Sequence, residues 1–208
     1  MSAGNVTIVD YGVGNLFSLI SSFDAVGGSA VVSRDPDVIA RSDKLILPGV
    51  GAFGDAAEKL RTTGLGDAVK EAAGRGGYLL GICLGMQLLF DRSFEFGEHG
   101  GLGLLRGDIV PIADEIPNGY KIPHIGWNSL TVTKPTAILP ESMTGQYVYF
   151  VHSYHARITD GSLSAVTEYG APLTAAAVND DGNVFGCQFH PEKSGKVGMS
   201  IIDAYNRL

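Results

Sequence analysis

A cysteine stands between two glycines where an apolar run suited to a strand meets one suited to a helix, in YLLGICLGMQLLF (78–90). The GICLG pattern around Cys83 has the form of a nucleophile elbow with cysteine in place of serine. In such an elbow a sharp turn lifts the side chain out of the sheet, and the positive end of the next helix favours a thiolate. The alternative is an inert buried cysteine, since cysteine is among the most commonly buried residue types.

A thiolate nucleophile needs a proton shuttle, usually a histidine that a third group orients. His190 fits this role best among the five histidines, because GCQFHPEKSG places it at the end of a strand-like run with Glu192 two residues later. Pro191 stiffens the link, and the period of a strand lets both side chains project the same way. The alternative is a chance His-Pro-Glu triplet at a solvated strand end.

A glycine-rich loop, LILPGVGAFGD (45–55), follows another strand-like run and could supply backbone N–H groups to an oxyanion. Its three glycines, Gly49, Gly51 and Gly54, also match the Gly-x-Gly-x-x-Gly pattern of dinucleotide-binding folds. The loop follows the third predicted strand and not the first, and no acidic residue stands at the end of a strand about 20 residues later. Dinucleotide binding is therefore disfavoured, and we expect no cofactor.

Other chemically capable residues have simpler explanations. His152 and His155 have a spacing that could suggest a metal site, but no cysteine or acidic cluster is near. On one strand their odd offset would send them to opposite faces, so we expect packing or surface roles and no metal. We interpret Cys187 as a small hydrophobic residue in a buried strand. Gln87 lies one helical turn beyond Cys83 and should be near the nucleophile.

The composition of the chain limits the classes of protein to which it can belong. The chain has 208 residues, 45% of them hydrophobic, and a net charge of −7, which suits a globular protein and argues against binding nucleic acid or an anionic membrane surface. Two cysteines are too few for a disulfide framework, which favours a reducing, cytoplasmic location. The first residues, MSAGNVTIVDYG, lack the pattern of a signal peptide. No segment approaches the ~18 apolar residues that span a membrane.

The first half of the chain alternates strand-like and helix-like patterns, which indicates a parallel sheet covered by helices. Asn15 can cap a helix that Gly27 and Gly28 end, and Asp55 can cap another through AAEKLR. A further helix is expected over LGDAVKEAAG and one directly after Cys83. The strands expected in this half are 6–10, 29–33, 44–48 and 78–82.

After Gly97 short strands separated by Gly, Asp, Asn and Pro predominate, with a hairpin turn at NDDGN (179–183) and a closing helix over GKVGMSIIDAYNRL. We find no repeat or linker, so we expect one α/β domain over residues 1–208 with some antiparallel strands in its second half. The strand-like stretches there are 101–112, 128–133, 146–158, 164–170, 173–178 and 183–190.

The motifs around the cysteine, the histidine and the glycine loop resemble the class I (triad) glutamine amidotransferases, a family with a flavodoxin-like α/β fold. Further stretches resemble, within that family, the glutaminase subunits of imidazole glycerol phosphate synthases. The resemblance runs from Val6 to about Lys196. Its triad motifs are GICLGMQ (81–87), PGVGAFGD (48–55) and FHPEKS (189–194). The narrower motifs are DYGVGN (10–15), LGMQLLFDRSFEFG (84–97), PHIGWN (123–128) and YFVHSYHA (149–156).

The resemblance implies that Cys83 hydrolyses the side-chain amide of glutamine through a thioester. His190 would be general base and then acid, and Glu192 would orient it. The N–H groups of Leu84 and Val50 would be the oxyanion donors.

For the substrate, L-glutamine, the resemblance implies that Glu95 pairs with the α-ammonium group. The other substrate-binding positions that it implies are Gly51, Gln87 and the backbone around Ser153 and Tyr154.

The resemblance also implies a partner, a separate (β/α)8-barrel cyclase subunit that receives the ammonia without its release to solvent. That subunit would use a phosphoribosyl-formimino intermediate to form imidazole glycerol phosphate and an aminoimidazole carboxamide ribotide in histidine biosynthesis. The loop-like composition of PHIGWN favours an interface role for Trp127, the only tryptophan, over a core role. The interface positions implied are Asn15, His124, Trp127, Tyr149 and Lys193.

Three other classes of protein remain as alternatives. A glutaminase of another pathway, such as vitamin B6 synthesis, shares the triad but not PHIGWN or DYGVGN. A cysteine hydrolase or chaperone-like protein on a similar fold would lack the His-Pro-Glu triplet late in the chain. A non-catalytic binding module would have a broken triad, and every residue of this one is present.

Overall fold

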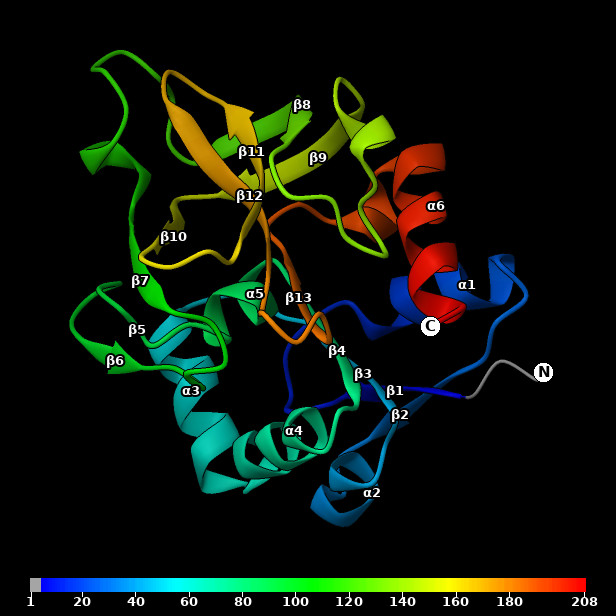
Figure 1. Cartoon of the computed structure of the whole chain (residues 1–208). Coiled ribbons are helices and arrows are strands. Elements are labelled where there is room, and N and C mark those ends of the chain that lie inside the picture. Colours follow the sequence, from blue (N-terminus) through cyan, green and yellow to red (C-terminus); the bar gives the residue numbers. More distant parts are fainter. Residues whose placement is uncertain (1–4) are drawn as a thin grey trace.

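The computed structural model describes residues 5–208. Its main sheet has nine strands in the order β2-β1-β3-β4-β13-β12-β11-β8-β9, and a smaller sheet has the order β10-β7-β5-β6 (Figure 1). The strands are β1 (Val6–Val9), β2 (Ala30–Ser33), β3 (Lys44–Leu47), β4 (Tyr78–Ile82), β5 (Arg92–Ser93), β6 (His99–Gly100), β7 (Gly107–Pro111), β8 (His124–Val132), β9 (Tyr147–His152), β10 (Tyr154–Ile158), β11 (Leu163–Glu168), β12 (Pro172–Val178) and β13 (Val184–Cys187).

The main sheet changes from parallel to antiparallel pairing at β13. Strands β2, β1, β3, β4 and β13 are parallel to one another, whereas β12, β11, β8 and β9 add on in antiparallel pairs. The predicted hairpin at 179–183 makes the first antiparallel connection, between β12 and β13. The α/β fold predicted from the sequence, with antiparallel strands in the second half, is confirmed.

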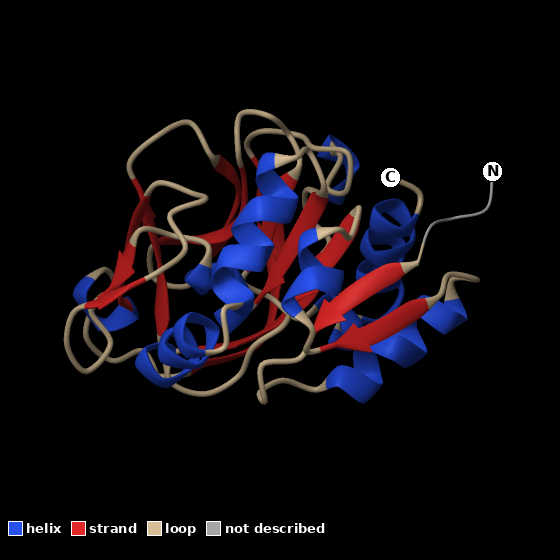
Figure 2. Ribbon diagram, turned by 90° about the horizontal axis from the view of Figure 1, so that it is seen from below, coloured by secondary structure: helices blue, strands red, loops and turns tan. Residues whose placement is uncertain are grey.

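Helices cover both faces of the parallel strands (Figure 2). Alternate residues of one strand face the two layers: Leu45 and Leu47 join the core under α3 and α4, and Ile46 joins the core under α1 and α6. Burial on both faces explains why these strands read as continuous apolar runs. The helices are α1 (Leu16–Ala25), α2 (Pro36–Ala40), α3 (Phe53–Thr62), α4 (Leu65–Gly74), α5 (Leu84–Leu88) and α6 (Gly195–Asn206), with 3₁₀ turns η1 (Ile112–Asp114), η2 (Glu141–Met143) and η3 (Pro191–Lys193).

Several local predictions hold and others need correction. Asn15 caps α1, since its side chain accepts a hydrogen bond from Ser18 N at 3.3 Å. Asp55 does not cap α3: the helix already begins at Phe53, and Asp55 lies inside its first turn. Helix α2 was not predicted, although Asp35 caps it and proline opens it, because it is only five residues long.

Two loop or strand boundaries also differ from the prediction. PHIGWN is not a loop, because β8 begins at His124 and pairs with β9 from His124 to Ser129. The stretch 146–158 is not one continuous strand: the chain leaves β9 at His152, passes Ser153 and enters β10 in the other sheet. His152 and His155 therefore lie in different sheets, and the argument from strand period did not apply to them.

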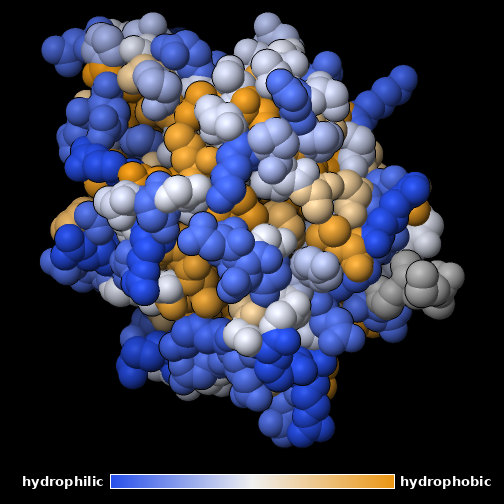
Figure 3. Space-filling model, in the orientation of Figure 1, coloured by the Kyte–Doolittle hydropathy of each residue, from blue (hydrophilic) through white to orange (hydrophobic). Residues whose placement is uncertain are grey.

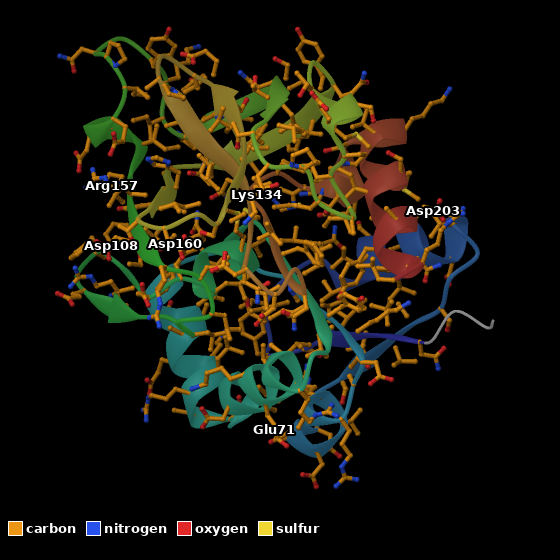
Figure 4. The ribbon with its side chains drawn as sticks, viewed as in Figure 1. Glu71, Asp108, Lys134, Arg157, Asp160 and Asp203 are labelled. Carbon is orange, nitrogen blue, oxygen red and sulfur yellow. The ribbon has the colours of Figure 1, made fainter. Side chains whose placement is uncertain are left out.

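Charged residues lie mainly at the outside of this fold. Figure 4 shows Asp108 and Arg157, which face each other across β7 and β10, at the outer side of the small sheet. On the face seen in Figure 3, hydrophilic residues predominate and hydrophobic residues are confined to patches among them. Within residues 5–208, no helix combines the length and the hydropathy that crossing a membrane requires.

Candidate active site

The chain makes the predicted sharp turn at Cys83, between β4 and α5. Cys83 has φ 54° and ψ −112°, and Phe96 is the other described non-glycine residue with a positive φ. Backbone strain of this kind marks functional sites when the surrounding structure enforces it. The flanking glycines are required by close approach: a Cβ on Gly85 would lie 1.8 Å from Leu47 O, and one on Gly81 would lie 2.7 Å from Gly85 O.

A buried histidine and carboxylate stand beside this turn. His190 Nδ1 and Glu192 Oε1 are 2.8 Å apart, and only 4% of each side chain is exposed. The η3 turn that begins at Pro191 brings Glu192 back to the ring. His190 Nε2 has no well-aligned protein partner among the described residues and is left for Cys83. Such catalytic contacts commonly align only when the substrate is bound.

The pKa of His190 reflects these neighbours. Burial alone would lower this pKa, but the interactions with the nearby Cys83 sulfur and with the Glu192 carboxylate raise it to about 9. The imidazole is therefore a cation at neutral pH. A protonated imidazole beside a cysteine can give its proton to a leaving group.

In the Cys83→Ala variant the pKa of His190 is expected to fall clearly below about 9, because burial remains and the interaction with the sulfur is lost. NMR titration of the imidazole nitrogens measures this shift. His155 is an internal control, since burial lowers its pKa to about 4 in a place away from the sulfur. An unchanged His190 titration would contradict the pairing of His190 with Cys83.

A pocket of about 300 Å³ opens in front of Cys83 at the carboxyl ends of the parallel strands. It brings together Cys83, His190, both expected oxyanion positions and every expected substrate position. The sequence did not identify Pro123, Val151 or His152 as part of its wall, although the last two directly precede Ser153. The pocket is lined by Val50, Gly51, Cys83, Leu84, Gln87, Glu95, Pro123, Val151, His152, Ser153, Tyr154, His190 and Lys193.

Two polar side chains in the pocket wall have fixed orientations. Gln87 Nε2 donates to Tyr154 O and to Gln188 Oε1, both at 3.0 Å, so its carbonyl oxygen is left for a ligand. Glu95 Oε2 accepts from Phe53 N at 2.5 Å, at the positive end of α3. Glu95 therefore also anchors the start of this helix, a contact that the sequence did not predict.

The residues expected at a partner interface divide into exposed and buried ones. Trp127 is 52% exposed and stacks edge-on against Tyr149 with ring centroids 6.0 Å apart. Asn15 and Lys193 are exposed as well. His124 is fully buried between the rings of Tyr169 and Phe150. The expectation that the His124 side chain contacts a partner is therefore not compatible with this conformation.

The remaining histidine and cysteine candidates lie in the core. His152 Nδ1 donates to Tyr154 O at 2.8 Å, and burial lowers the pKa of His152 to about 3. Cys187 is 1% exposed, and burial raises its thiol pKa to about 12, as expected for a small buried hydrophobe. Across residues 5–208 no group of three or more His, Cys, Asp or Glu side chains is arranged to hold a metal ion.

A larger cavity, of about 840 Å³, lies between α3, α4 and the segment 95–102. It shares Glu95 with the smaller pocket, but neither Cys83 nor His190 reaches it. Size alone therefore does not identify the reactive site. The smaller pocket holds the strained cysteine and the charged histidine.

A strained cysteine, a buried His-Glu pair and an α/β sheet that presents them at its carboxyl edge define a triad-type cysteine hydrolase. Comparison with known protein families narrows this class. The glutamine amidotransferase class-I family matches residues 7–204. The chain belongs to this family.

Its curated relatives include HisH subunits of imidazole glycerol phosphate synthase. HisH of Caldanaerobacter subterraneus subsp. tengcongensis is 46% identical, covering 98% of both chains. HisH of Wolinella succinogenes is 47% identical over 95% of this chain and 96% of its own. Among solved structures, PurLQS from Thermotoga maritima aligns with a TM-score of 0.70 at 22% identity, covering 97% of this chain and 96% of that one, which supports the fold.

Proposed function

We propose that this protein is the glutaminase subunit of imidazole glycerol phosphate synthase. It hydrolyses L-glutamine and delivers the ammonia to a separate (β/α)8-barrel cyclase subunit for histidine biosynthesis. The observation that carries the proposal is the pocket in which Cys83, His190 and the glutamine-binding positions meet. The identity to HisH subunits over nearly the whole chain supports the choice of pathway. The 208 residues act as one amidotransferase domain, and the reactive thiol suits a reducing cytoplasm.

In the proposed reaction, Cys83 is the nucleophile and His190 carries the proton. The Cys83 thiolate attacks the amide carbon of glutamine, and a tetrahedral intermediate forms. His190 gives its proton to the departing nitrogen as the C–N bond breaks, so ammonia leaves and a thioester remains. His190 then takes a proton from water, which attacks the thioester and releases glutamate. Glu192 holds the ring by Nδ1 throughout.

Two backbone N–H groups stabilise the oxyanion of the intermediate. Leu84 N begins α5 and carries the positive end of its dipole. Val50 N belongs to the glycine loop, where Gly51 has φ +100°, a conformation that side chains disfavour. Gly49 is needed for space, because a Cβ there would lie 2.8 Å from Gly85 N.

Rotation of the peptide that presents Val50 N–H switches the site on when the ligand-bound cyclase docks. One missing oxyanion donor costs roughly 100- to 1,000-fold in rate, so this movement alone suffices for a latent state. Hydrolysis by the isolated chain as fast as by the ligand-bound complex would contradict this switch.

The glutamine side chain enters the pocket with its amide toward Cys83. Gly51, Gln87 and the backbone at Ser153 and Tyr154 hold the substrate. The α-ammonium group pairs with Glu95, which then serves both the ligand and the start of α3.

The cyclase binds the exposed face formed by Asn15, Trp127, Tyr149 and Lys193, beside the mouth of the pocket. Three of these residues lie on neighbouring elements: Trp127 and Tyr149 are cross-strand partners, and Tyr149 O accepts from His190 N at 3.0 Å, next to η3, which holds Lys193. His124 supports this face from beneath and does not form part of it.

The Trp127→Ala variant is expected to weaken binding of the cyclase roughly thirtyfold, because an exposed aromatic of this size is a typical interface anchor. Calorimetric titration with the cyclase measures this loss. Phe96→Ala is the matched control, since Phe96 is 87% exposed and lies outside this face. Equal affinities of the Trp127 variant and the unsubstituted protein would place the interface elsewhere.

Glutaminase assays with and without the cyclase test the proposed function as a whole. Hydrolysis of glutamine that rises when this cyclase and its ligand are added supports it. Glutaminase activity that responds only to the synthase of another pathway would assign the chain to that pathway. The absence of any glutamine hydrolysis would refute the assignment.

A further inference from the structure

The side chain of Gln188 is buried against the nucleophile, and the mechanism above gives it no role. Gln188 directly follows β13 and has no exposed surface. Its backbone N–H donates to Ala175 O at 2.9 Å, which fixes the residue in the sheet two positions before His190. Its Nε2 lies 3.8 Å from Cys83 Sγ. The sequence offered one signal, a glutamine in the CQFHPE motif, which could equally have been a surface residue.

The orientation of the Gln188 amide is determined by its neighbours. Tyr154 O can only accept, so Gln87 must present its Nε2 there. The same Nε2 donates to the Gln188 side chain at 3.0 Å, which must therefore present Oε1. The NH₂ group of Gln188 then has to face the sulfur. The hydrogen bonds that run from Tyr154 O through Gln87 to Gln188 therefore leave one N–H of Gln188 facing Cys83 Sγ.

Besides His190, the sulfur has two polar neighbours that favour opposite protonation states. Val151 O is 3.9 Å from Sγ and can accept a hydrogen bond from a thiol. Gln188 Nε2 can donate to a thiolate, whereas the carbonyl of Val151 would repel one. Loss of the thiol proton therefore exchanges the Val151 contact for the Gln188 contact. Gln188 stabilises the form of Cys83 that reacts.

Packing alone does not explain a glutamine at this position. Burying an amide away from water costs free energy unless its groups are hydrogen-bonded, and methionine would fill a similar volume without that cost. Among the described side chains, the Gln188 amide nitrogen Nε2 donates to the sulfur of Cys83. Hydrogen bonds to an ionised acceptor are about twice as strong as neutral ones, so the benefit depends on the thiolate.

We propose that Gln188 is a catalytic residue that donates a hydrogen bond to the Cys83 thiolate, with Gln87 holding its amide in the required orientation. The inference rests on one part of the proposed function, that Cys83 is the nucleophile. It is independent of the identity of the partner and of the pathway.

The test is the pH dependence of Cys83 alkylation by iodoacetamide, followed by mass spectrometry on the full chain without glutamine. It compares the unsubstituted protein with Gln188→Met and Gln188→Glu. Gln188→Glu keeps the size of the side chain and the oxygen that accepts from Gln87. It replaces the amide N–H that faces the Cys83 sulfur. Gln146→Met is the matched control at an exposed glutamine. The other titratable groups near the sulfur, which are the same in all proteins, are Tyr11, Glu95, His152, His190, Glu192 and Lys193.

At low pH the alkylation of Cys83 is expected to be about tenfold slower in Gln188→Met, and slower still in Gln188→Glu, where a carboxylate faces the sulfur. The limiting rate at high pH should be unchanged, so the midpoint of the rate profile moves to higher pH. A folded variant with the alkylation profile of the unsubstituted protein would overturn the proposal. Because the measurement needs no glutamine, it can fail while the proposed function stands.

A second measurement needs no substitution at Gln188. In the unsubstituted protein, the NMR signals of the Gln188 side-chain amide protons should shift over the same pH range in which the rate of Cys83 alkylation changes. In Cys83→Ala this shift should be absent. A shift that persists in Cys83→Ala, or that is absent from both proteins, would show that the amide does not respond to the sulfur.

Discussion

The Cys83→Ala variant is expected to lose glutamine hydrolysis by roughly 10⁴-fold or more, while its complex with the cyclase still forms product from free ammonia. The loss is large because the thioester path needs the sulfur, and neither His190 nor the oxyanion donors can replace it. The ammonia-dependent reaction persists because the cyclase chemistry belongs to the other subunit. Steady-state assays with glutamine and with ammonium as nitrogen sources measure both quantities.

Cys187→Ala is the matched control for this experiment. Cys187 is almost fully buried on β13, and its thiol has a raised pKa, so its removal should leave glutamine hydrolysis within a few-fold of the unsubstituted value. A glutamine-reactive electrophile should likewise label Cys83 and spare Cys187. Loss of the ammonia-dependent reaction in Cys83→Ala would contradict the division of labour between the two chains.

The Gly85→Ala variant is expected to lose on the order of 4 kcal/mol or more of folding stability, a large part of the about 5–15 kcal/mol that stabilises a typical domain. The new Cβ would lie 1.8 Å from Leu47 O and 2.7 Å from the carbonyl carbon of Leu47. Both partners in this clash are backbone, so α5 would have to move away from the end of β3, and Cys83 with it. Urea denaturation followed by circular dichroism measures the loss.

Gly74→Ala is the matched control for the stability experiment. Gly74 ends α4, and a Cβ there would meet nothing within 4 Å. Alanine is the better helix former by up to about 1 kcal/mol, so this variant should be as stable as the unsubstituted protein or slightly more stable. If both variants had the same denaturation midpoint, the close packing of the elbow would be refuted.

The sequence predicted the parts of the site that depend on local rules. The turn at Cys83 could be predicted because glycines on both sides of it permit close approach of β3 and α5. The pairing of His190 with Glu192 was predicted from the period of a strand, and that reason is wrong: the η3 turn that begins at Pro191 brings the carboxylate back to the ring. Parallel strands such as β3 could be predicted because both of their faces are buried, which gives a continuous apolar run in the sequence.

The features that the sequence could not predict depend on contacts between distant segments. Glu95 caps α3 across 42 positions of sequence, and nothing near Glu95 indicates which helix it reaches. The amide of Gln188 faces Cys83 only because Gln87 and Tyr154, from two other elements, orient it. His124 seemed to belong to a loop because of its Gly and Pro neighbours, but strand pairing with β9 overrides that composition and buries the ring.

The central claim is that this pocket produces ammonia and passes it to the cyclase. Isotope labelling tests it most directly. The complex of this protein with the cyclase is supplied with [amide-¹⁵N]glutamine and an excess of unlabelled ammonium, and the imidazole product is analysed by mass spectrometry. If this pocket generates the ammonia and passes it on without release, most of the product nitrogen will carry the label. Product whose nitrogen matches the unlabelled ammonium in solution would contradict the account.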